Sequence, residues 1–277
     1  MEKVFCIIPA RYSSTRARGK VLRKILEKPL IEWVWQNASK MSCFRDVFVA
    51  TDSEEIEDSV KKFGGKIIKT SSLHKCGTDR VAEAAGILNI DGKDIVVNIQ
   101  ADEPLISSLS IEELILSLRK SQATDMATLA YQSSNIKEFQ NSNVVKVVVD
   151  RNNFALYFSR SPIPHCREDK QNCFTSFRNS KKDKGKEKVD SDFKSAIQTG
   201  FVFLKHLGIY AYKMSFLQKI AGLPVSPLEE KEKLEQLRVL ENGYKIKVVD
   251  SLSDSESVNT EEDFKTVENM LQTQIQK

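Results

Sequence analysis

Four basic side chains lie within ten residues of one another near the N-terminus. They follow the apolar run VFCII at residues 4–8, and they are Arg11, Arg16, Arg18 and Lys20. Confined to one loop without an anion, these charges repel one another, and guanidinium groups match the oxygens of phosphate. The stretch therefore predicts a polyphosphate-binding loop. The alternative is a surface loop whose charges are simply solvated.

Glycine-built phosphate loops are excluded by residue identity. A G-x-x-x-x-G-K-[ST] loop needs glycine where this chain has Ser14, and a hydroxyl residue where it has Val21. The dinucleotide motif G-x-G-x-x-G is also absent. The polyphosphate is therefore expected to be held by side chains rather than by closely approaching backbone.

Two acids follow the most apolar predicted strand, DIVVNI at residues 94–99. In the sequence QADEP, Asp102 and Glu103 leave this strand where a hard cation such as Mg²⁺ would find oxygen ligands near the phosphates. Asp102 is the candidate metal ligand. The alternative is that both acids only cap the helix predicted to begin near Ser107.

Other metal and nucleophile sites find no support. His74, His165 and His206 lack metal-ligand spacing, and the serines lack a nucleophile-elbow setting. His206 either donates a hydrogen bond to a polar ligand or is a structural histidine. The five cysteines contain no C-x-x-C pair, which indicates neither a disulfide framework nor a zinc site, and we expect a reducing, cytoplasmic setting.

The charge balance argues against a nucleic-acid partner. The net charge is +4, and residues 178–188 carry six cations against two acids, so the rest of the chain is neutral. A general nucleic-acid binder spreads its positive charge over a stripe or face.

We also expect no membrane span, because no apolar stretch is long enough, and no export signal, because a strand begins by Val4.

Short β-branched runs alternate with segments of helical period over the first 100 residues, which predicts an α/β fold with a mainly parallel sheet covered on both faces. In such sheets ligands bind at the carboxyl ends of the strands, where the loops containing Arg11 and Asp102 lie. The predicted strands are 4–8, 46–52, 66–71 and 94–99, and the predicted helices are 29–41, 53–64 and 78–88.

After about residue 124 the pattern changes to strands without intervening helices. The runs 125–131, 143–150 and 153–159 predict an antiparallel addition to the sheet, with a hairpin turn at DRNN between the last two. Residues 168–199 are polar and lysine-rich, which predicts a surface insertion within a single domain of residues 1–277.

The C-terminal third returns to helical patterns. Residues 226–243 predict one strong helix ending at Asn242-Gly243, and a strand follows. A last helix is predicted from Thr260, whose hydroxyl suits the N-cap position ahead of three acids.

The chain resembles the cytidylyltransferases that activate 3-deoxy-manno-octulosonate (Kdo), the acidic sugar of bacterial lipopolysaccharide. The resemblance covers nearly the whole chain, in order and with compatible spacing. It is carried by IIPARYSSTR and GK, VATD, GTDR, VNIQADEP, MATLAY, VKVVVD, ALYFSRSPIP, HLGIYAY and LEQLRVLE.

The resemblance implies a nucleotide-diphospho-sugar-transferase-like three-layer fold and a homodimer formed through the antiparallel extension. It implies that CTP and Kdo give CMP-Kdo and pyrophosphate with Mg²⁺ present, by in-line attack of the anomeric hydroxyl on the α-phosphorus. Two alternatives remain open. One is activation of a related 2-keto acid sugar, such as 8-amino-Kdo or a sialic-acid relative, and the other is a catalytically silent nucleotide-binding homologue.

Site residues follow from the resemblance by matching position. The residues expected at the reacting phosphates are Arg11, Arg16, Lys20 and Asp102. Those expected around the nucleotide are Ala10, Arg11, Lys20, Gly77, Thr78, Arg80 and Gln100. Those expected at the sugar are Arg160, His206, Tyr210, Glu235 and Gln236. The expected metal ligands are Asp102 and Asn259.

The chain departs from the family pattern at several of these positions. Asn259 stands where the family has an aspartate at the metal, so one negative charge is lost, although an amide oxygen still ligates Mg²⁺. Residues 17–21, ARGKV, replace Leu-Pro-Gly-Lys-Pro, so two prolines are lost from the phosphate loop. Ala101 replaces a glycine, and Cys76 replaces a serine near the base.

Overall fold

The main sheet mixes a parallel half and an antiparallel half. The structure, a computed structural model, describes residues 2–12, 19–74, 76–121, 123–165 and 202–275. The strand order is β11-β7-β10-β6-β1-β4-β5, with β8 paired to β10 and β9 paired to β8. The strands are β1 (Val4–Ala10), β4 (Asp46–Thr51), β5 (Lys66–Lys69), β6 (Ile95–Asn98), β7 (Met126–Ser133), β8 (Lys146–Val149), β9 (Ala155–Ser159), β10 (Phe203–Lys213) and β11 (Lys247–Asp250).

Helices cover both faces of this sheet, which confirms the predicted α/β class. Side chains alternate along β1, so Cys6 and Ile8 pack with α1, α2 and α4, whereas Ile7 packs with α3, α7 and α9. The helices are α1 (Leu30–Ser39), α2 (Glu54–Lys62), α3 (Gly77–Ile87), α4 (Ser108–Lys120), α5 (Ile136–Gln140), α7 (Met214–Ala221), α8 (Pro227–Glu232), α9 (Gln236–Glu241) and α10 (Glu261–Ile275), with a 3-10 turn η1 (Lys20–Leu22).

The parallel strands put the predicted phosphate and metal loops at one edge. Strand β1 pairs in parallel with β4 and with β6, so these strands end on the same side of the sheet. The loop after β1 leads to η1, and the QADEP segment follows β6. Burial of the apolar strands therefore fixes where the two polar loops meet.

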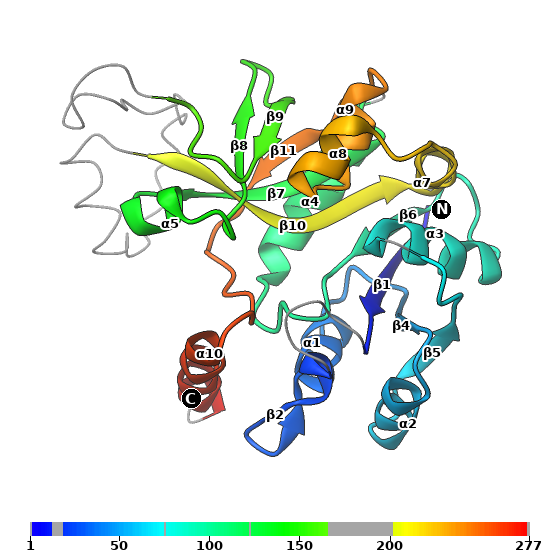
Figure 1. Cartoon of the computed structure of the whole chain (residues 1–277). Helices are drawn as coiled ribbons and strands as arrows, with labels where there is room; N and C mark the ends of the chain where they lie inside the picture. Colours follow the sequence, from blue (N-terminus) through cyan, green and yellow to red (C-terminus); the bar gives the residue numbers. More distant parts are fainter. Residues whose placement is uncertain (1, 13–18, 75, 122, 166–201, 276–277) are drawn as a thin grey trace.

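The antiparallel half contains the predicted hairpin. Strand β8 pairs antiparallel with β9, and the backbone N–H of Asn153 donates to Asp150 O across the turn at 3.0 Å. Asn153 takes the left-handed conformation at φ 61°, which asparagine tolerates better than most residues. The hairpin projects away from the parallel strands (Figure 1). Its part in dimerisation stays a prediction.

The single helix predicted over residues 226–243 is wrong. The chain forms α8 and α9, separated at Lys233, which has φ 53° and ψ 46°. Tertiary contacts outweigh the helical period here: Leu234 is buried in the core, and the Glu232 carboxylate accepts hydrogen bonds from the Ser159 hydroxyl at 2.6 Å and the Arg160 N–H at 3.0 Å. The break turns Glu235 towards α3.

The C-terminal helix α10 packs beside α1 and the small hairpin of β2 (Lys24–Ile25) and β3 (Lys28–Pro29), as Figure 1 shows. Val258, Phe264 and Val267 form a separate apolar cluster with Ile25 and Leu30. Thr260 is the predicted N-cap, since its hydroxyl accepts from Asp263 N at 3.2 Å and Asp263 Oδ2 accepts from Thr260 N at 2.7 Å. This docking holds residue 259 near the loop after β1.

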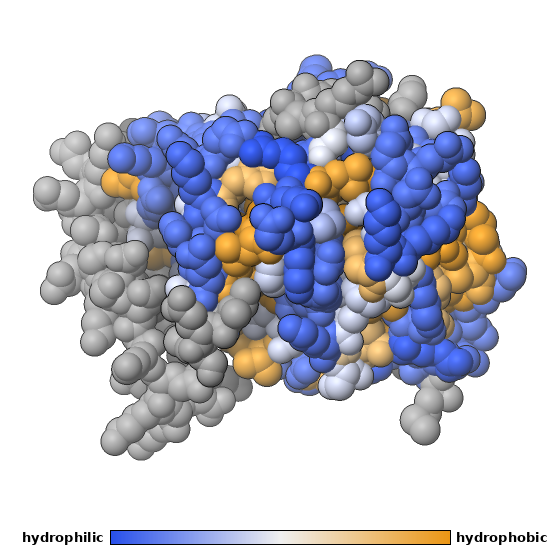
Figure 2. All heavy atoms as spheres, turned by 90° about the horizontal axis from the view of Figure 1, so that it is seen from below, coloured by the Kyte–Doolittle hydropathy of each residue, from blue (hydrophilic) through white to orange (hydrophobic). Residues whose placement is uncertain are grey.

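The surface of the described residues mixes polar and apolar side chains. Figure 2 shows hydrophilic residues over much of one face with hydrophobic residues between them. No helix within the described ranges is long and apolar enough to cross a membrane. The predicted insertion at 168–199, together with Arg16 and Arg18, lies outside the described residues.

Candidate active site

Lys20 and Asp102 meet at the carboxyl edge of the sheet. Lys20 Nζ lies 2.5 Å from Asp102 Oδ2, although 82 residues separate them in the chain. Both side chains are partly shielded, with 12% of Lys20 and 26% of Asp102 exposed. Lys20 and Asp102, which the sequence analysis expects at the same phosphates, therefore lie in contact, and their role in a site stays a prediction.

Asn259 joins the same pair from the other end of the chain. Its Oδ1 lies 3.4 Å from Lys20 Nζ, and the neighbouring Val258 N–H donates to Asp102 O at 2.9 Å. The backbone N–H of Asn259 donates to Asp263 Oδ2 at 2.7 Å, which fixes the residue at the start of α10. Two side-chain oxygens thus converge on one ammonium group.

This donor set fits a hard divalent cation in part. The ammonium of Lys20 marks a point that Asp102 and Asn259 oxygens both face, and oxygen is the ligand that Mg²⁺ prefers. Among the described residues, no group of three or more His, Cys, Asp and Glu side chains is suited to a metal ion. Asp102 and Asn259 thus offer two of the oxygen ligands that such an ion would need.

The second acid of QADEP takes no part in this cation site. Glu103 is buried, and its Oε2 accepts a hydrogen bond from the Ser255 hydroxyl. Burial first, and then the charge of Asp102, raises the pKa of Glu103 well above its usual range. Of the two acids, only Asp102 therefore remains a metal candidate, whereas Glu103 binds Ser255 in the segment before α10.

Arg11 and Arg80 bring further positive charge to the strand ends. Arg80 is 1% exposed, with Nη2 at 3.1 Å from Asp52 Oδ1 and Nη1 donating to Thr70 Oγ1 at 2.5 Å. Burial lowers the pKa of Arg80, Asp52 opposes this, and the nearby charge of Arg11 lowers it further. Arg11 follows the end of β1 at Ala10, so its charge adds to that of Arg80 on this side of the sheet.

Four predicted residues converge where α3 begins. A Cβ on Gly77 would lie 3.7 Å from Gln100 Oε1 and 3.9 Å from Glu235 Oε1, so Gly77 lies close to both side chains. Glu235 Oε2 accepts from Thr78 N at 3.2 Å, which places a carboxylate at the positive end of the helix. Glu235, expected at the sugar, thus touches residues expected at the nucleotide.

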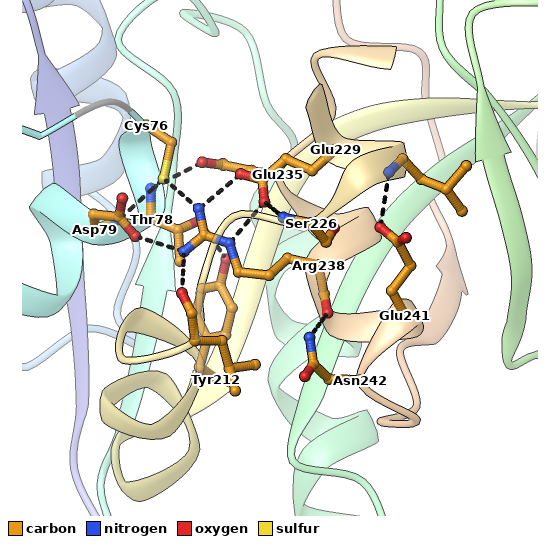
Figure 3. Close-up of polar contacts among 12 residues, drawn as sticks. Cys76, Thr78, Asp79, Tyr212, Ser226, Glu229, Glu235, Arg238, Glu241 and Asn242 are labelled. Carbon is orange, nitrogen blue, oxygen red and sulfur yellow. Dashed lines mark hydrogen bonds and ion pairs between the residues drawn. The ribbon is translucent and has the colours of Figure 1, made fainter. Parts of the chain in front are cut away.

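Arg238, for which the sequence predicts no role, lines the same small cavity as Thr78 and Glu235. Figure 3 shows its guanidinium between α8 and the start of α3. Nε and Nη2 donate to Glu229 at 2.8 and 2.7 Å, and Nη1 donates to Asp79 Oδ1 at 3.2 Å. Nη2 also lies 4.0 Å from Sγ of Cys76, the N-cap of α3. The buried arginine therefore holds the turn at residues 76–79 against α8 and α9.

His206 and Tyr210 flank a bulge in β10. The pairing of β10 with β7 shifts between these two residues, and Gly208 has φ 69°. Gln100 Nε2 donates to Gly208 O at 3.2 Å, which connects the bulge to the nucleotide residues. Burial raises the pKa of Tyr210 and lowers that of His206 to about 3, so both are neutral at pH 7.

The remaining predicted sugar residues lie on α9 and after β9. Gln236 and Tyr210 line a small cavity of about 10 Å³ together with Thr78 and Glu235. The Nε2 of Gln236 is buried without a hydrogen-bond partner among the described residues. Arg160 lies against the end of α8, where its Nε donates to Glu232 O at 2.7 Å. The guanidinium of Arg160 therefore lies next to α8, whereas the side chain of Gln236 lines the cavity.

Comparisons with known proteins match this chain to cytidylyltransferases over most of its length. The family model described as Cytidylyltransferase matches residues 5–246. The chain is 45% identical to the 3-deoxy-manno-octulosonate cytidylyltransferase of Thermodesulfovibrio yellowstonii, covering 97% of this chain and 98% of that protein. It is 44% identical to the protein of that name from Syntrophobacter fumaroxidans, covering 96% and 95%.

A solved structure agrees with these relatives. The structure of a CMP:2-keto-3-deoxy-manno-octonic acid synthetase in complex with CTP matches with a TM-score of 0.81 and 34% identity, over 99% of this chain and 100% of that chain. The mixed sheet and its flanking helices are thus an arrangement that the matched protein shares.

Proposed function

The chain belongs to the 3-deoxy-manno-octulosonate cytidylyltransferases, and from that membership we propose that it makes CMP-Kdo and pyrophosphate from CTP and Kdo for lipopolysaccharide synthesis. The observation that carries the proposal is the contact of Lys20 with Asp102 and Asn259, beside the cluster of Gly77, Gln100 and Glu235. These contacts support the proposal that Lys20 binds phosphate and that the cluster around Gly77 binds the base.

In this reaction the protein has to position the two substrates and neutralise the charge of the phosphates. The anomeric hydroxyl attacks the α-phosphorus in line, and pyrophosphate leaves with the electron pair of the broken bond. Lys20, Arg11 and Arg16 hold the triphosphate. The backbone of Ala10 and the turn at Gly77 and Thr78 enclose the cytosine, with Gln100 facing the nucleotide.

Arg80 is proposed to add positive charge beneath the surface of this nucleotide site. Its buried guanidinium adds positive charge at the strand ends, where Asp52 balances it in part. The charge that remains favours a bound triphosphate over the empty loop.

Mg²⁺ is the proposed cofactor, with Asp102 and Asn259 as its protein ligands. When bound, the ion supplies charge neutralisation at the phosphates. Lys20, which pairs with Asp102 in the structure, would share this carboxylate with the ion and would also be available to the triphosphate.

The sugar is proposed to lie between the bulge of β10 and α9, against His206, Tyr210, Glu235 and Gln236. Arg160 is the cation among the predicted sugar residues, and it is proposed to face the carboxylate of Kdo. The contact of Glu235 with Thr78 supports this proposal, because transfer requires the sugar and the nucleotide to lie side by side.

The test is product formation with defined components. The protein is incubated with CTP, Mg²⁺ and Kdo, and CMP-Kdo is detected by mass, with each component omitted in turn. Side-by-side reactions with 8-amino-Kdo and a sialic acid compare the sugars. CTP binding without any CMP-sugar product would instead identify a silent nucleotide-binding protein.

A matched pair of variants ties activity to this site. Lys20→Met removes the ammonium that faces Asp102 and is expected to lower turnover by about a hundredfold or more. Lys24→Met is the control, because the Lys24 side chain is 64% exposed and pairs only locally with Glu27. Equal activity of the two variants would contradict the assignment.

We further propose a homodimer in the cytoplasm. The β8–β9 hairpin exposes 62% of Leu156 at the edge of the antiparallel half, which suits a contact between two copies. Light scattering on the wild type and on Leu156→Lys measures the mass, and a dimer weakened by the lysine is expected. The cytoplasm is proposed because CTP is made there and because Cys6, Cys43 and Cys76 are free thiols.

A further inference from the structure

One buried hydroxyl beside the β10 bulge has two partners. Thr128 Oγ1 lies 2.7 Å from Ile209 O and 2.9 Å from His206 Nε2. A carbonyl oxygen only accepts, so the single hydroxyl hydrogen of Thr128 is donated to Ile209. The hydroxyl therefore has to accept its second hydrogen bond, and the donor is the Nε2–H of His206.

The directions of these two hydrogen bonds fix the tautomer of His206. A neutral imidazole carries one N–H, so a hydrogen on Nε2 leaves Nδ1 as an acceptor. The ring is held in place by the edge of Phe158 at 4.8 Å and by Tyr210 at 5.5 Å between centroids. His206 is 9% exposed.

We propose that Thr128 is a positioning residue that holds His206 in the tautomer whose Nδ1 accepts a hydrogen bond from a sugar hydroxyl. The inference rests on the proposed function for the identity of that ligand, and on hydrogen-bond geometry alone for the tautomer. Because Thr128 sits on β7 and Ile209 on the bulge of β10, the pairing of two strands sets the protonation of the ring.

The tautomer decides which sugar group the site accepts. An unprotonated nitrogen attracts a hydroxyl hydrogen and repels carboxylate oxygens. Burial keeps the ring neutral, with the pKa of His206 lowered to about 3. His206 therefore receives a hydroxyl, and the sugar carboxylate has to bind elsewhere.

The tautomer is tested directly on the wild-type protein. Histidine labelled with nitrogen isotopes and long-range nitrogen–proton correlation NMR at neutral pH distinguish the two tautomers and the charged ring. The chain has three histidines, and His206→Gln identifies the signals that belong to residue 206. The expected result is Nε2–H with an unprotonated Nδ1. A hydrogen on Nδ1, or a charged ring, would overturn the inference.

The role in the site is tested by variants of Thr128. Thr128→Val keeps the shape but removes both hydrogen bonds, and it is expected to raise KM for Kdo about five- to tenfold while KM for CTP changes by less than about twofold. Thr128→Ser keeps the hydroxyl and is expected to restore the wild-type KM. The matched control is Thr266→Val on the exposed side of α10.

The outcomes separate this inference from the proposed function. If wild type forms no CMP-sugar at all, the proposed function fails and the sugar assignment of Nδ1 fails with it, whereas NMR still decides the tautomer. If wild type is active but Thr128→Val raises both KM values equally or lowers only kcat, the residue is merely structural and the proposal is refuted. His206→Asn, which keeps an acceptor near Nδ1, is expected to bind Kdo better than His206→Gln.

Discussion

Replacing Asn259 by aspartate tests how the cation site depends on charge. In the structure Asn259 is exposed, and its Oδ1 lies 3.4 Å from the ammonium of Lys20, which also pairs with Asp102. The change Asn259→Asp keeps the oxygen where it is and adds one negative charge. Asn152→Asp, at the exposed β8–β9 turn, adds the same charge outside the site and serves as the control.

The expected gain in Mg²⁺ affinity of Asn259→Asp follows from Coulomb's law. At about 4 Å in water one unit charge attracts another by about 1 kcal/mol, so a carboxylate attracts a divalent cation by about 2 kcal/mol. The exposure of Asn259 justifies the dielectric of water, and dissolved salt reduces the attraction further. We expect the half-saturating Mg²⁺ concentration to fall about tenfold, which corresponds to about 1.4 kcal/mol.

The assay is pyrophosphate release at saturating CTP and Kdo over a titration of Mg²⁺. Half-saturating concentrations are compared for wild type, Asn259→Asp and Asn152→Asp at fixed ionic strength. A half-saturating concentration that is the same in wild type and Asn259→Asp would show that residue 259 does not contribute to metal binding. An equal fall in the control would assign the effect to net charge.

Three further predictions concern stability and the insertion. Arg238→Met leaves Glu229 buried without its partner and is expected to lower the free energy of unfolding by about 3–5 kcal/mol, measured by urea denaturation against the exposed control Arg151→Met. Because the folded pKa of His206 is about 3 against the usual 6.5, the unfolded chain binds one more proton between these values. Wild type therefore loses about 2 kcal/mol between pH 6.5 and 5 through this group, and a His206→Gln variant with the same pH dependence would disprove this. Deletion of residues 176–192 is expected to leave turnover nearly unchanged, and a collapse of turnover would contradict the reading of this segment as a tolerated insertion.

The sheet and its loops were predictable because burial dictates them. The alternation of apolar runs and helical segments fixes the parallel strands, and parallel strands end at a common edge. The meeting of Lys20 with Asp102 follows from this, since each residue follows its own strand. The β8–β9 hairpin was predictable for a similar local reason, its turn sequence.

The features that the sequence did not predict depend on contacts between residues far apart in the chain. The break at Lys233 arises because Leu234 is buried and Glu232 binds residues after β9, and no helical period contains that information. Arg238 reads as one charge on a predicted helix, although its partner Asp79 lies 159 residues away. Thr128 reads as one more strand residue, because only the bulge of β10 reveals its hydrogen bonds.

The joining of Asn259 to Lys20 couples activity to the order of synthesis. During synthesis Lys20 leaves the ribosome well before residue 259 and α10. Contacts of such long sequence separation form late, since loop closure precedes them. Asn259 is therefore held beside Lys20 only after α10 has docked, and a chain shortened before Glu261 is expected to form the sheet but to lose this contact.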